Sequence, residues 1–297
     1  MTESEQAWTI RRLLEWTTPF LTRKGVDSPR LSAELLLSHV LSVPRIKLYT
    51  DYERAVGEKE LTAFRELVRR AAEHEPIAYL TSRAHFFNLE FEVNRDVLIP
   101  RPDTETLVEN VLQSVRSQPG MDPPRVLDLC TGSGCVAAAI ACHLKNATVL
   151  ATDSSAAAVA LARKNMQKLG LDGRVVVEHG DLYEAVTRQV DVQPFHLIVA
   201  NPPYIPTGEI AELDRNVREY EPTAALDGGP DGLSLHRRIL AGAADRLVSG
   251  GRIYLEIAFD QGELARQVAA QHDRFSDVAI LKDYGGRDRV LTAKKAG

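Results

Sequence analysis

The chain has 297 residues, 44% hydrophobic and 26% charged, a composition typical of a globular protein with room for two domains. Its net charge of −5 disfavours a protein that coats nucleic acid, because phosphate binding needs clustered Lys and Arg. Cys130, Cys135 and Cys142 form no CxxC pair and have no histidine pair at ligand spacing, so we expect no metal site and a reducing compartment.

The first 75 residues are predicted to form a small helical domain. Apolar residues recur at helical spacing over 10–21, 31–40 and 61–71. Ser28 followed by Pro29 indicates a second helix that is capped by the serine and has proline at its first position.

The N-terminus also bears on location. Glu3 and Glu5 stand where a signal peptide would carry positive charge. No stretch approaches the roughly 20 apolar residues of a membrane-spanning helix. We therefore expect a cytoplasmic protein without membrane contact.

A short β-hairpin is predicted within residues 76–100, because apolar and polar residues alternate from 87 to 94 with period two. The segment 99–103 should be rigid, since Pro100 and Pro102 fix their own φ and restrict their neighbours. Asp103 can cap a helix that runs from 104 to about 117.

Residues 101–297 are predicted to form one α/β domain in which strands and helices alternate. Expected strands are 126–129, 149–152, 175–178, 197–200, 252–256, 278–281 and 289–292, and expected helices lie near 136–143, 155–169, 233–247 and 262–271. Such βαβ units imply a seven-stranded, mostly parallel sheet with helices on both faces. The six residues 283–288 are too few for a parallel crossover, so the last two strands should pair antiparallel.

The first strand of this domain runs into a glycine turn, Cys130-Thr131-Gly132-Ser133-Gly134, where ligands bind in open α/β sheets. Two cofactors fit the glycines. Gly132-x-Gly134-x-x-Ala137 with Asp153 about 20 residues on matches a dinucleotide fingerprint. The same turn also suits S-adenosylmethionine.

Acidic residues at successive strand ends favour S-adenosylmethionine. Asp128 would lie where a dinucleotide places its pyrophosphate, and like charges repel. The Asp128 carboxylate would instead attract the positively charged sulfonium and α-amino group of S-adenosylmethionine. Asp153 can accept hydrogen bonds from both ribose hydroxyls, and Asp181 from the adenine amino group.

The fourth strand runs directly into Asn201-Pro202-Pro203-Tyr204. The Asn201 side-chain oxygen and the Pro202 carbonyl can accept from the two N–H groups of a planar amide or amine. This grip would aim the nitrogen lone pair at a methyl group without a strong general base. Tyr204 can press on the planar group near the sulfonium.

These motifs resemble class I amino-methyltransferases, and further segments narrow the resemblance to the HemK/PrmC family, the glutamine-N5 methyltransferases of peptide-chain release factors. The segments are Pro76-Ile77-Ala78-Tyr79-Leu80, Val97-Leu98-Ile99-Pro100-Arg101-Pro102-Asp103-Thr104-Glu105, Glu221-Pro222 through Gly232, and Gly286-Arg287-Asp288-Arg289-Val290. The resemblance covers nearly the whole chain and is strongest from 76 to 297. It implies a class I (Rossmann-like) methyltransferase fold.

The resemblance also implies a substrate, the glutamine of the Gly-Gly-Gln loop of class 1 release factors. It implies cofactor contacts at 130–134, Asp153, Leu182 and Asn201, and substrate contacts at 201–204. The helical domain would help to dock the release factor. Ser82 and Asn88 stand where the family often has glycine, which puts the geometry of the hairpin turn in question.

Alternatives remain for the site. Arg101 either steers an acidic partner or stiffens a turn. The same Asn-Pro-Pro-aromatic logic serves amino-methyltransferases that act on adenine N6 or guanine N2, which the acidic charge disfavours. A nicotinamide oxidoreductase is disfavoured by Asp128, and a non-catalytic binding module by the intact loop. We expect a monomer with no direct nucleic-acid partner.

Overall fold

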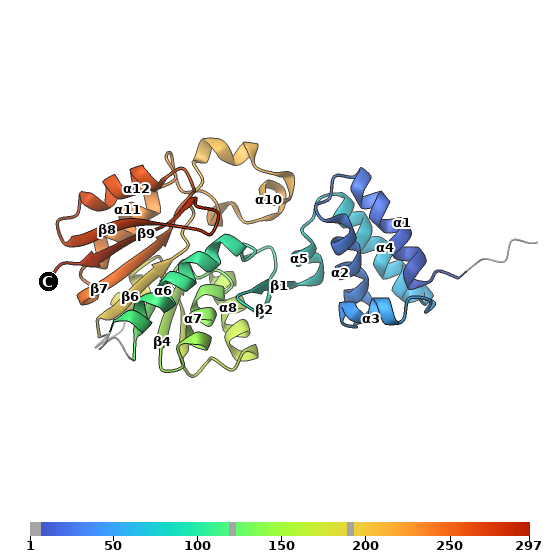
Figure 1. Ribbon diagram of the computed structural model, residues 1–297, viewed down its shortest axis with the longest axis horizontal. Helices are drawn as coiled ribbons and strands as arrows, with labels where there is room; N and C mark the ends of the chain where they lie inside the picture. Colours follow the sequence, from blue (N-terminus) through green and yellow to red (C-terminus); the bar gives the residue numbers. More distant parts are fainter. Residues whose placement is uncertain (1–6, 119–122, 189–192) are drawn as a thin grey trace, which may run out of the picture. The chain divides into compact units, whose positions relative to one another are not determined.

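The computed structural model describes residues 7–118, 123–188 and 193–297, and therefore does not include Glu3 and Glu5. The described chain forms two compact units (Figure 1). One unit contains the described residues up to Arg83 together with Asp214–Tyr220, and the other contains the described residues of Ala84–Leu213 and Glu221–Gly297. No helix of the described residues is long and apolar enough to cross a membrane.

The smaller unit is helical, and its three predicted helices are confirmed. Its elements are α1 (Ile10–Arg23), α2 (Pro29–Leu41), α3 (Arg45–Thr50), α4 (Glu58–Ala72), α5 (Ile77–Thr81) and the distant α10 (Arg215–Tyr220). Leu14, Leu36 and Phe64 are buried between the long helices. The predicted serine cap is wrong, because Ser28 has a left-handed backbone (φ 45°) and its side chain makes no capping bond, although Pro29 does begin the helix.

A hairpin of β1 (Arg83–Phe86) and β2 (Leu89–Glu92) comes first in the larger unit, which starts at Ala84, the second residue of β1. Phe87 and Asn88 have φ values of 50° and 61° and form its two-residue turn, so Phe87 is not part of a strand as predicted. Hairpin turns of this kind need positive φ at both central residues. Ser82 also has positive φ (55°), so glycine would be accommodated without strain at both Ser82 and Asn88.

The seven predicted strands form one sheet. They are β3 (Arg125–Leu129), β4 (Thr148–Asp153), β5 (Val175–His179), β6 (Phe195–Ala200), β7 (Leu247–Glu256), β8 (Phe275–Lys282) and β9 (Asp288–Lys295). Their order is β5-β4-β3-β6-β7-β9-β8. Strands β3 to β7 are parallel, and β9 pairs antiparallel with both β7 and β8, as the short final connection predicted.

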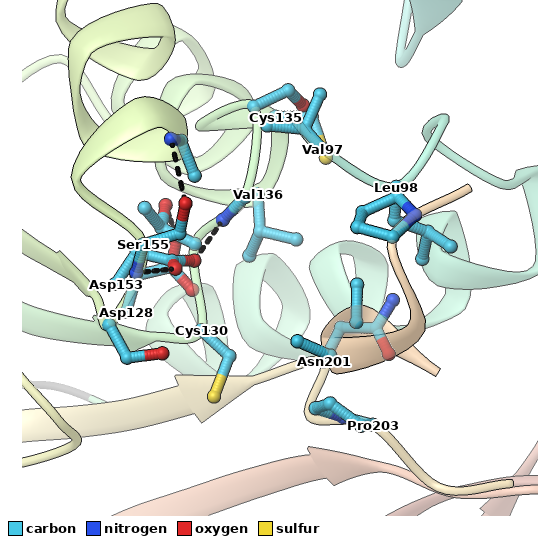
Figure 2. A pocket seen from close by; sticks show the side chains of 18 of the residues that line it. Val97, Leu98, Asp128, Cys130, Cys135, Val136, Asp153, Ser155, Asn201 and Pro203 are labelled. Atoms are coloured by element: carbon cyan, nitrogen blue, oxygen red, sulfur yellow. Dashed lines mark hydrogen bonds between the residues drawn. The ribbon is translucent and has the colours of Figure 1, made fainter. Parts of the chain in front are cut away.

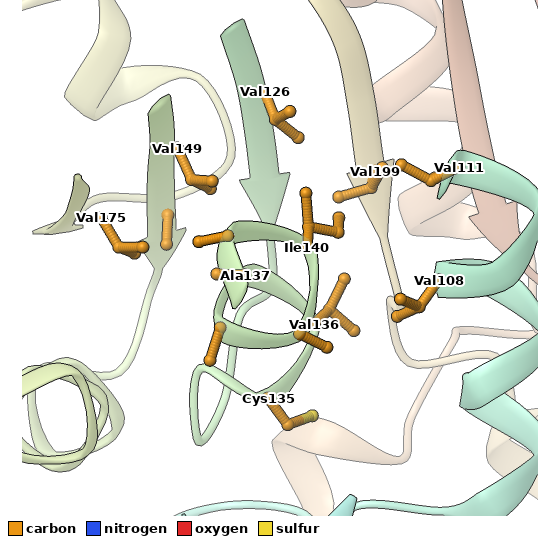
Figure 3. Close-up of a cluster of buried hydrophobic side chains, with 14 of the residues drawn as sticks. Val108, Val111, Val126, Cys135, Val136, Ala137, Ile140, Val149, Val175 and Val199 are labelled. Atoms are coloured by element: carbon orange, nitrogen blue, oxygen red, sulfur yellow. The ribbon is translucent and has the colours of Figure 1, made fainter. Parts of the chain in front are cut away.

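Helices cover both faces of this sheet. One core contains residues of α6 (Glu105–Ser117), α7 (Cys135–His143) and α8 (Ala156–Lys168), and Figure 3 shows Val108, Ile140 and Val199 meeting there. The other core contains residues of α9 (Glu184–Thr187), α11 (Ser234–Ala243) and α12 (Gly262–Ala270). The helices cover the two faces of the sheet and leave the carboxyl ends of its strands accessible to a ligand.

The entry to α6 differs from the prediction. A 3-10 turn, η1 (Pro102–Thr104), runs straight into the helix, and no side chain caps it. Because Pro102 starts the helical turn early, Asp103 is inside it and not at its cap. The Asp103 carboxylate instead pairs with Arg289 of β9, at 2.9 Å. Further 3-10 turns, η2 (Thr207–Glu212) and η3 (Thr223–Ala225), lie beyond β6.

Candidate active site

A cavity lies at the carboxyl ends of β3, β4 and β6, where parallel strands finish at one edge of the sheet. It brings together most of the predicted site residues: Asp128, Cys130, Thr131, Gly132, Ser133, Asp153, Asp181, Leu182, Asn201, Pro203 and Arg101. In Figure 2, Asp128 and Asp153 lie on one side of the cavity and Asn201 and Pro203 on the other. Gly134, Pro202 and Tyr204 are adjacent to the cavity without lining it.

The Asp153 carboxylate is fixed by backbone donors. The N–H of Gly132 donates to Oδ2 and that of Ser155 donates to Oδ1, each at 2.9 Å. Burial raises its pKa, and these two hydrogen bonds counteract that shift. Each carboxylate oxygen keeps a lone pair that a neighbouring hydroxyl of a ribose could use.

Asp128 is almost completely buried beneath the glycine turn. The Thr131 hydroxyl donates to its Oδ2 at 2.6 Å. Burial raises the pKa of Asp128 to about 7. A cationic ligand in the cavity would reverse this shift, because an opposite charge favours the carboxylate.

The two glycines of the turn have different roles. Gly132 has φ of +55°, and a Cβ there would meet no atom within 4 Å, which leaves open space toward the cavity. A Cβ on Gly134 (φ +81°) would lie 2.7 Å from Met166 Cε and 3.4 Å from Ala162 Cβ. Gly134 therefore permits close packing of the turn against α8, a role that its spacing in the sequence did not reveal.

Two non-glycine residues at the cavity have left-handed backbones. Cys130 has φ of 55° and Leu182 has φ of 47°. The Leu182 carbonyl accepts a hydrogen bond from the buried Thr152 hydroxyl at 3.2 Å, which helps to hold its loop. Strained residues of this kind concentrate in ligand-binding loops. Burial raises the pKa of the Cys130 thiol, so it stays protonated.

Asp181 has a partner that the sequence did not indicate. Arg238 of α11 donates to its Oδ2 at 2.5 Å. This pair is exposed to solvent, and Asp181 lines the cavity. The adenine contact of Asp181 stays a prediction.

Asn201 is oriented by a neighbour from another element. Its Nδ2 donates to the Thr104 hydroxyl at 3.1 Å. Within the described residues no donor reaches Asn201 Oδ1, which can therefore accept from a ligand. Tyr204 is anchored from both ends: its hydroxyl donates to Glu256 Oε1 at 3.4 Å, and its carbonyl accepts from Gln261 Nε2 at 2.8 Å.

Arg101 is at the wall of the cavity and pairs with Glu221, whose side chain is almost fully buried. The second oxygen of Glu221 accepts from the Ile99 amide at 3.1 Å. The guanidinium thus neutralises a buried carboxylate and joins the rigid 99–103 segment to the segment after α10. A substrate contact of Arg101 stays a prediction.

The comparisons with known proteins cover both units. A family model described as PrmC N-terminal domain matches residues 12–81, and one described as Methyltransferase small domain matches residues 103–214. The release factor glutamine methyltransferase of Rhodopirellula baltica is 39% identical over 296 residues, which are 99% of each chain. That of Geobacter sulfurreducens is 41% identical over 291 residues, or 98% of each chain.

Solved structures agree on the fold. A methyltransferase from Pyrococcus furiosus has a TM-score of 0.50 and 19% identity, covering 77% of this chain and 98% of that one. The hMettl16 catalytic domain has a TM-score of 0.51 and 18% identity, covering 70% of this chain and 76% of that one. The predicted Rossmann-like methyltransferase fold is therefore confirmed.

Proposed function

The chain belongs to the release factor glutamine methyltransferase family, and on this premise we propose that it methylates the side-chain amide nitrogen (N5) of the glutamine in the Gly-Gly-Gln loop of class 1 peptide-chain release factors. The family and the fold imply S-adenosylmethionine as the methyl donor. The observation that carries the proposal is the Asn201 amide, whose Nδ2 is held by Thr104 while its Oδ1 is left to the cavity.

The cavity residues fit S-adenosylmethionine. Asp153 offers a fixed carboxylate to two neighbouring hydroxyls, Asp128 offers a buried carboxylate to a cation, and Gly132 leaves open space beside the turn. Cys130, Thr131, Ser133, Asp181 and Leu182 complete the proposed cofactor contacts. When bound, this cofactor supplies an electrophilic methyl group on a sulfonium.

The contribution of the loop 201–204 is orientation. An amide nitrogen is a poor nucleophile because its lone pair is delocalised. Asn201 Oδ1 and the Pro202 carbonyl would each accept one of its N–H bonds, which favours a pyramidal nitrogen in the transition state. Pro203 at the cavity wall and Tyr204, anchored on Glu256, would hold the loop and confine the planar group.

The helical unit is proposed to dock the release factor. It carries a groove lined by aromatic residues, in which Trp16 is 54% exposed and stacks on Phe20 with ring centroids 5.1 Å apart. Exposed aromatic clusters of this kind typically mark protein-binding surfaces. In this proposal Trp16→Ala raises KM for an intact release factor and leaves KM for a Gly-Gly-Gln peptide unchanged. An equal effect on both substrates would contradict docking.

The reaction itself is tested with labelled methyl donor and two possible acceptors, purified release factor and total RNA. We expect label in the release factor, and none when its loop glutamine is replaced. Label that appears in the RNA and not in the release factor would refute the proposal and indicate an amino-methyltransferase that acts on nucleic acid. Translation termination in the cytoplasm is the cellular setting that this activity implies, with the enzyme as a monomer.

A further inference from the structure

Glu256 is a buried carboxyl beside the proposed amide grip. Parallel pairing of β6 with β7 sets Ala200 against Leu255, so Asn201 and Glu256 follow side by side at the strand ends. The Glu256 side chain has no exposed surface. Burying an unpaired carboxylate destabilises a fold, and an apolar residue of similar size would usually serve stability better. Packing therefore does not explain why a glutamate occupies position 256.

The Thr104 hydroxyl lies near both Asn201 and Glu256, and its contact with Asn201 is a hydrogen bond of ordinary geometry. Asn201 Nδ2 donates to Thr104 Oγ1 at 3.1 Å, and the Thr104 hydroxyl lies close enough to Glu256 to lower its pKa as a hydrogen-bond donor. The Tyr204 hydroxyl donates to Glu256 Oε1 at 3.4 Å. Oε2 has no hydrogen bond of ordinary geometry within the described residues. An ionised carboxylate only accepts, whereas a hydroxyl has a single proton to donate.

We propose that Glu256 is a positioning residue, whose carboxylate sets the direction of the chain from Asn201 through Thr104. With Glu256 as the acceptor, the Thr104 proton points at Glu256 and the Thr104 lone pair receives Asn201 Nδ2. Asn201 Oδ1 is then directed to the substrate amide. If Glu256 is protonated and donates instead, the Thr104 hydroxyl donates its proton to the Asn201 side chain. The Asn201 amide then rotates to accept it, and its NH₂ group faces the substrate. The N–H groups of the substrate amide need an acceptor, so this arrangement is unproductive. This inference rests on the proposed function.

Burial is the main influence on the pKa of Glu256, and the charged and polar groups around it modify this effect. Arg289 of β9 lowers its pKa and Asp103 of η1 raises it, while Tyr204 faces it from the loop after β6. Arg289 itself pairs with Asp103 and Asp283.

Two further groups complete this environment. Burial raises the pKa of Cys135 of α7, with a smaller contribution from Glu256, so this thiol stays neutral. His236 of α11 contacts the Glu256 backbone carbonyl through Nε2 at 2.7 Å, and burial lowers the histidine pKa to about 4, so it is neutral as well. Burial dominates, and it raises the pKa of Glu256 to about 7.

The test compares Glu256→Gln, Thr104→Val and Thr104→Ser in the full-length protein with release factor as substrate. The amide in E256Q has the shape of the native carboxylate but can donate to Thr104. We expect E256Q and T104V each to lower kcat at least tenfold, with KM for release factor and Kd for S-adenosylmethionine within threefold of wild type. T104S keeps the hydroxyl and should stay within threefold in kcat. The double variant E256Q/T104V should be no slower than the slower single variant, because both changes break one chain.

A pH profile separates this role from a structural one. At saturating cofactor, kcat of the wild type should fall below pH about 7 as Glu256 becomes protonated, and kcat of E256Q should be flat across that range. Wild-type kcat in E256Q, a T104S as slow as T104V, or additive losses in the double variant would each overturn the inference. Failure of the wild type to methylate release factor would instead refute the proposed function.

Discussion

Asn165 of α8 binds both backbone groups of Glu92 in the hairpin: its Oδ1 accepts from the Glu92 amide at 2.8 Å, and its Nδ2 donates to the Glu92 carbonyl at 3.0 Å. The same Nδ2 donates to the Ser133 carbonyl at 2.9 Å. One side chain thus ties the hairpin to the glycine turn of the proposed cofactor site.

Replacing Asn165 with alanine should lower the free energy of unfolding by about 2–4 kcal/mol, because it leaves buried backbone groups without partners. Affinity for S-adenosylmethionine should fall as well, since Ser133 loses its support. Chemical denaturation and calorimetry measure the two effects. The exposed Asn146→Ala is the matched control and should change neither. An Asn165→Ala protein as stable as this control would contradict the argument.

The two glycines of the turn should respond differently to alanine. Gly134→Ala imposes a left-handed backbone on alanine and places a Cβ 2.7 Å from Met166 Cε, the movable end of a flexible side chain, and 3.4 Å from Ala162 Cβ, so we expect a loss of stability of roughly 2 kcal/mol. In Gly132→Ala the new Cβ meets no atom, so the free energy of unfolding should fall by only about 1 kcal/mol, the cost of the left-handed backbone. The same Cβ extends into the open space beside the turn and should weaken cofactor binding. Thermal unfolding of the two variants checks the order, and a more stable Gly134→Ala would disprove it.

Asn201→Ala tests the acceptor role in the proposed reaction. Removal of Oδ1 should lower turnover by about 10²-fold or more, because the interaction is needed most in the transition state. Cofactor affinity should stay within about tenfold. Single-turnover rates at saturating cofactor, with Kd from calorimetry, separate these quantities. Wild-type turnover in this variant would refute the role of Asn201.

Asp153→Ala should weaken cofactor binding and have little effect on turnover, the reverse of Asn201→Ala. The variant loses the carboxylate that Gly132 and Ser155 hold in place, so we expect Kd for S-adenosylmethionine to rise at least tenfold. At saturating cofactor, kcat should recover to within a few-fold. Asp172→Ala, at an exposed loop position, is the control. Unchanged affinity by calorimetry would remove Asp153 from the site.

The sequence predicts those parts of the molecule that depend on neighbours along the chain. All seven strands are recognisable because each contains a short run of apolar residues that ends at a turn, and Asp128, Asp153 and Asn201 stand at such ends. The supports of the site are different, because they join segments far apart. Thr104 and Asn201 are 97 residues apart, Glu92 and Asn165 are 73 apart, and Arg101 and Glu221 are 120 apart.

Local signals also fail where a distant contact overrides them. Asp103 has the sequence context of a helix cap, yet its carboxylate pairs with Arg289, which the fold brings from the last strand. The alternation through Phe87 suggests a strand, yet the hairpin turns there because Phe86 and Phe91 are both buried in the core. In both cases tertiary packing decides between locally acceptable conformations.

The pH dependence of stability provides a last test, centred on Asp128. Its pKa in the folded protein is about 7, above the ordinary value of 3.8, because burial disfavours the charge. A carboxyl with a raised folded pKa stabilises the fold fully below its unfolded pKa and loses that contribution as pH rises through the folded value. Between pH 4 and 7 the contribution of Asp128 to the free energy of unfolding should therefore decrease with rising pH, by up to about 1.4 kcal/mol per pH unit. Buried His236, whose pKa is lowered to about 4, contributes a slope of the opposite sign up to the ordinary histidine value of 6.5.

Asp128→Asn removes the Asp128 titration and should make the slope of stability against pH more positive than in the wild type in that window, as should E256Q, whose carboxyl has the same direction of shift. The two effects should add if the groups titrate independently. S-adenosylmethionine should counteract the loss in the wild type, because its cationic groups stabilise the Asp128 carboxylate. Denaturation curves from about pH 4.5 to 7.5, with and without the cofactor, measure all three slopes. A slope for Asp128→Asn equal to that of the wild type would show that Asp128 is already ionised throughout the window.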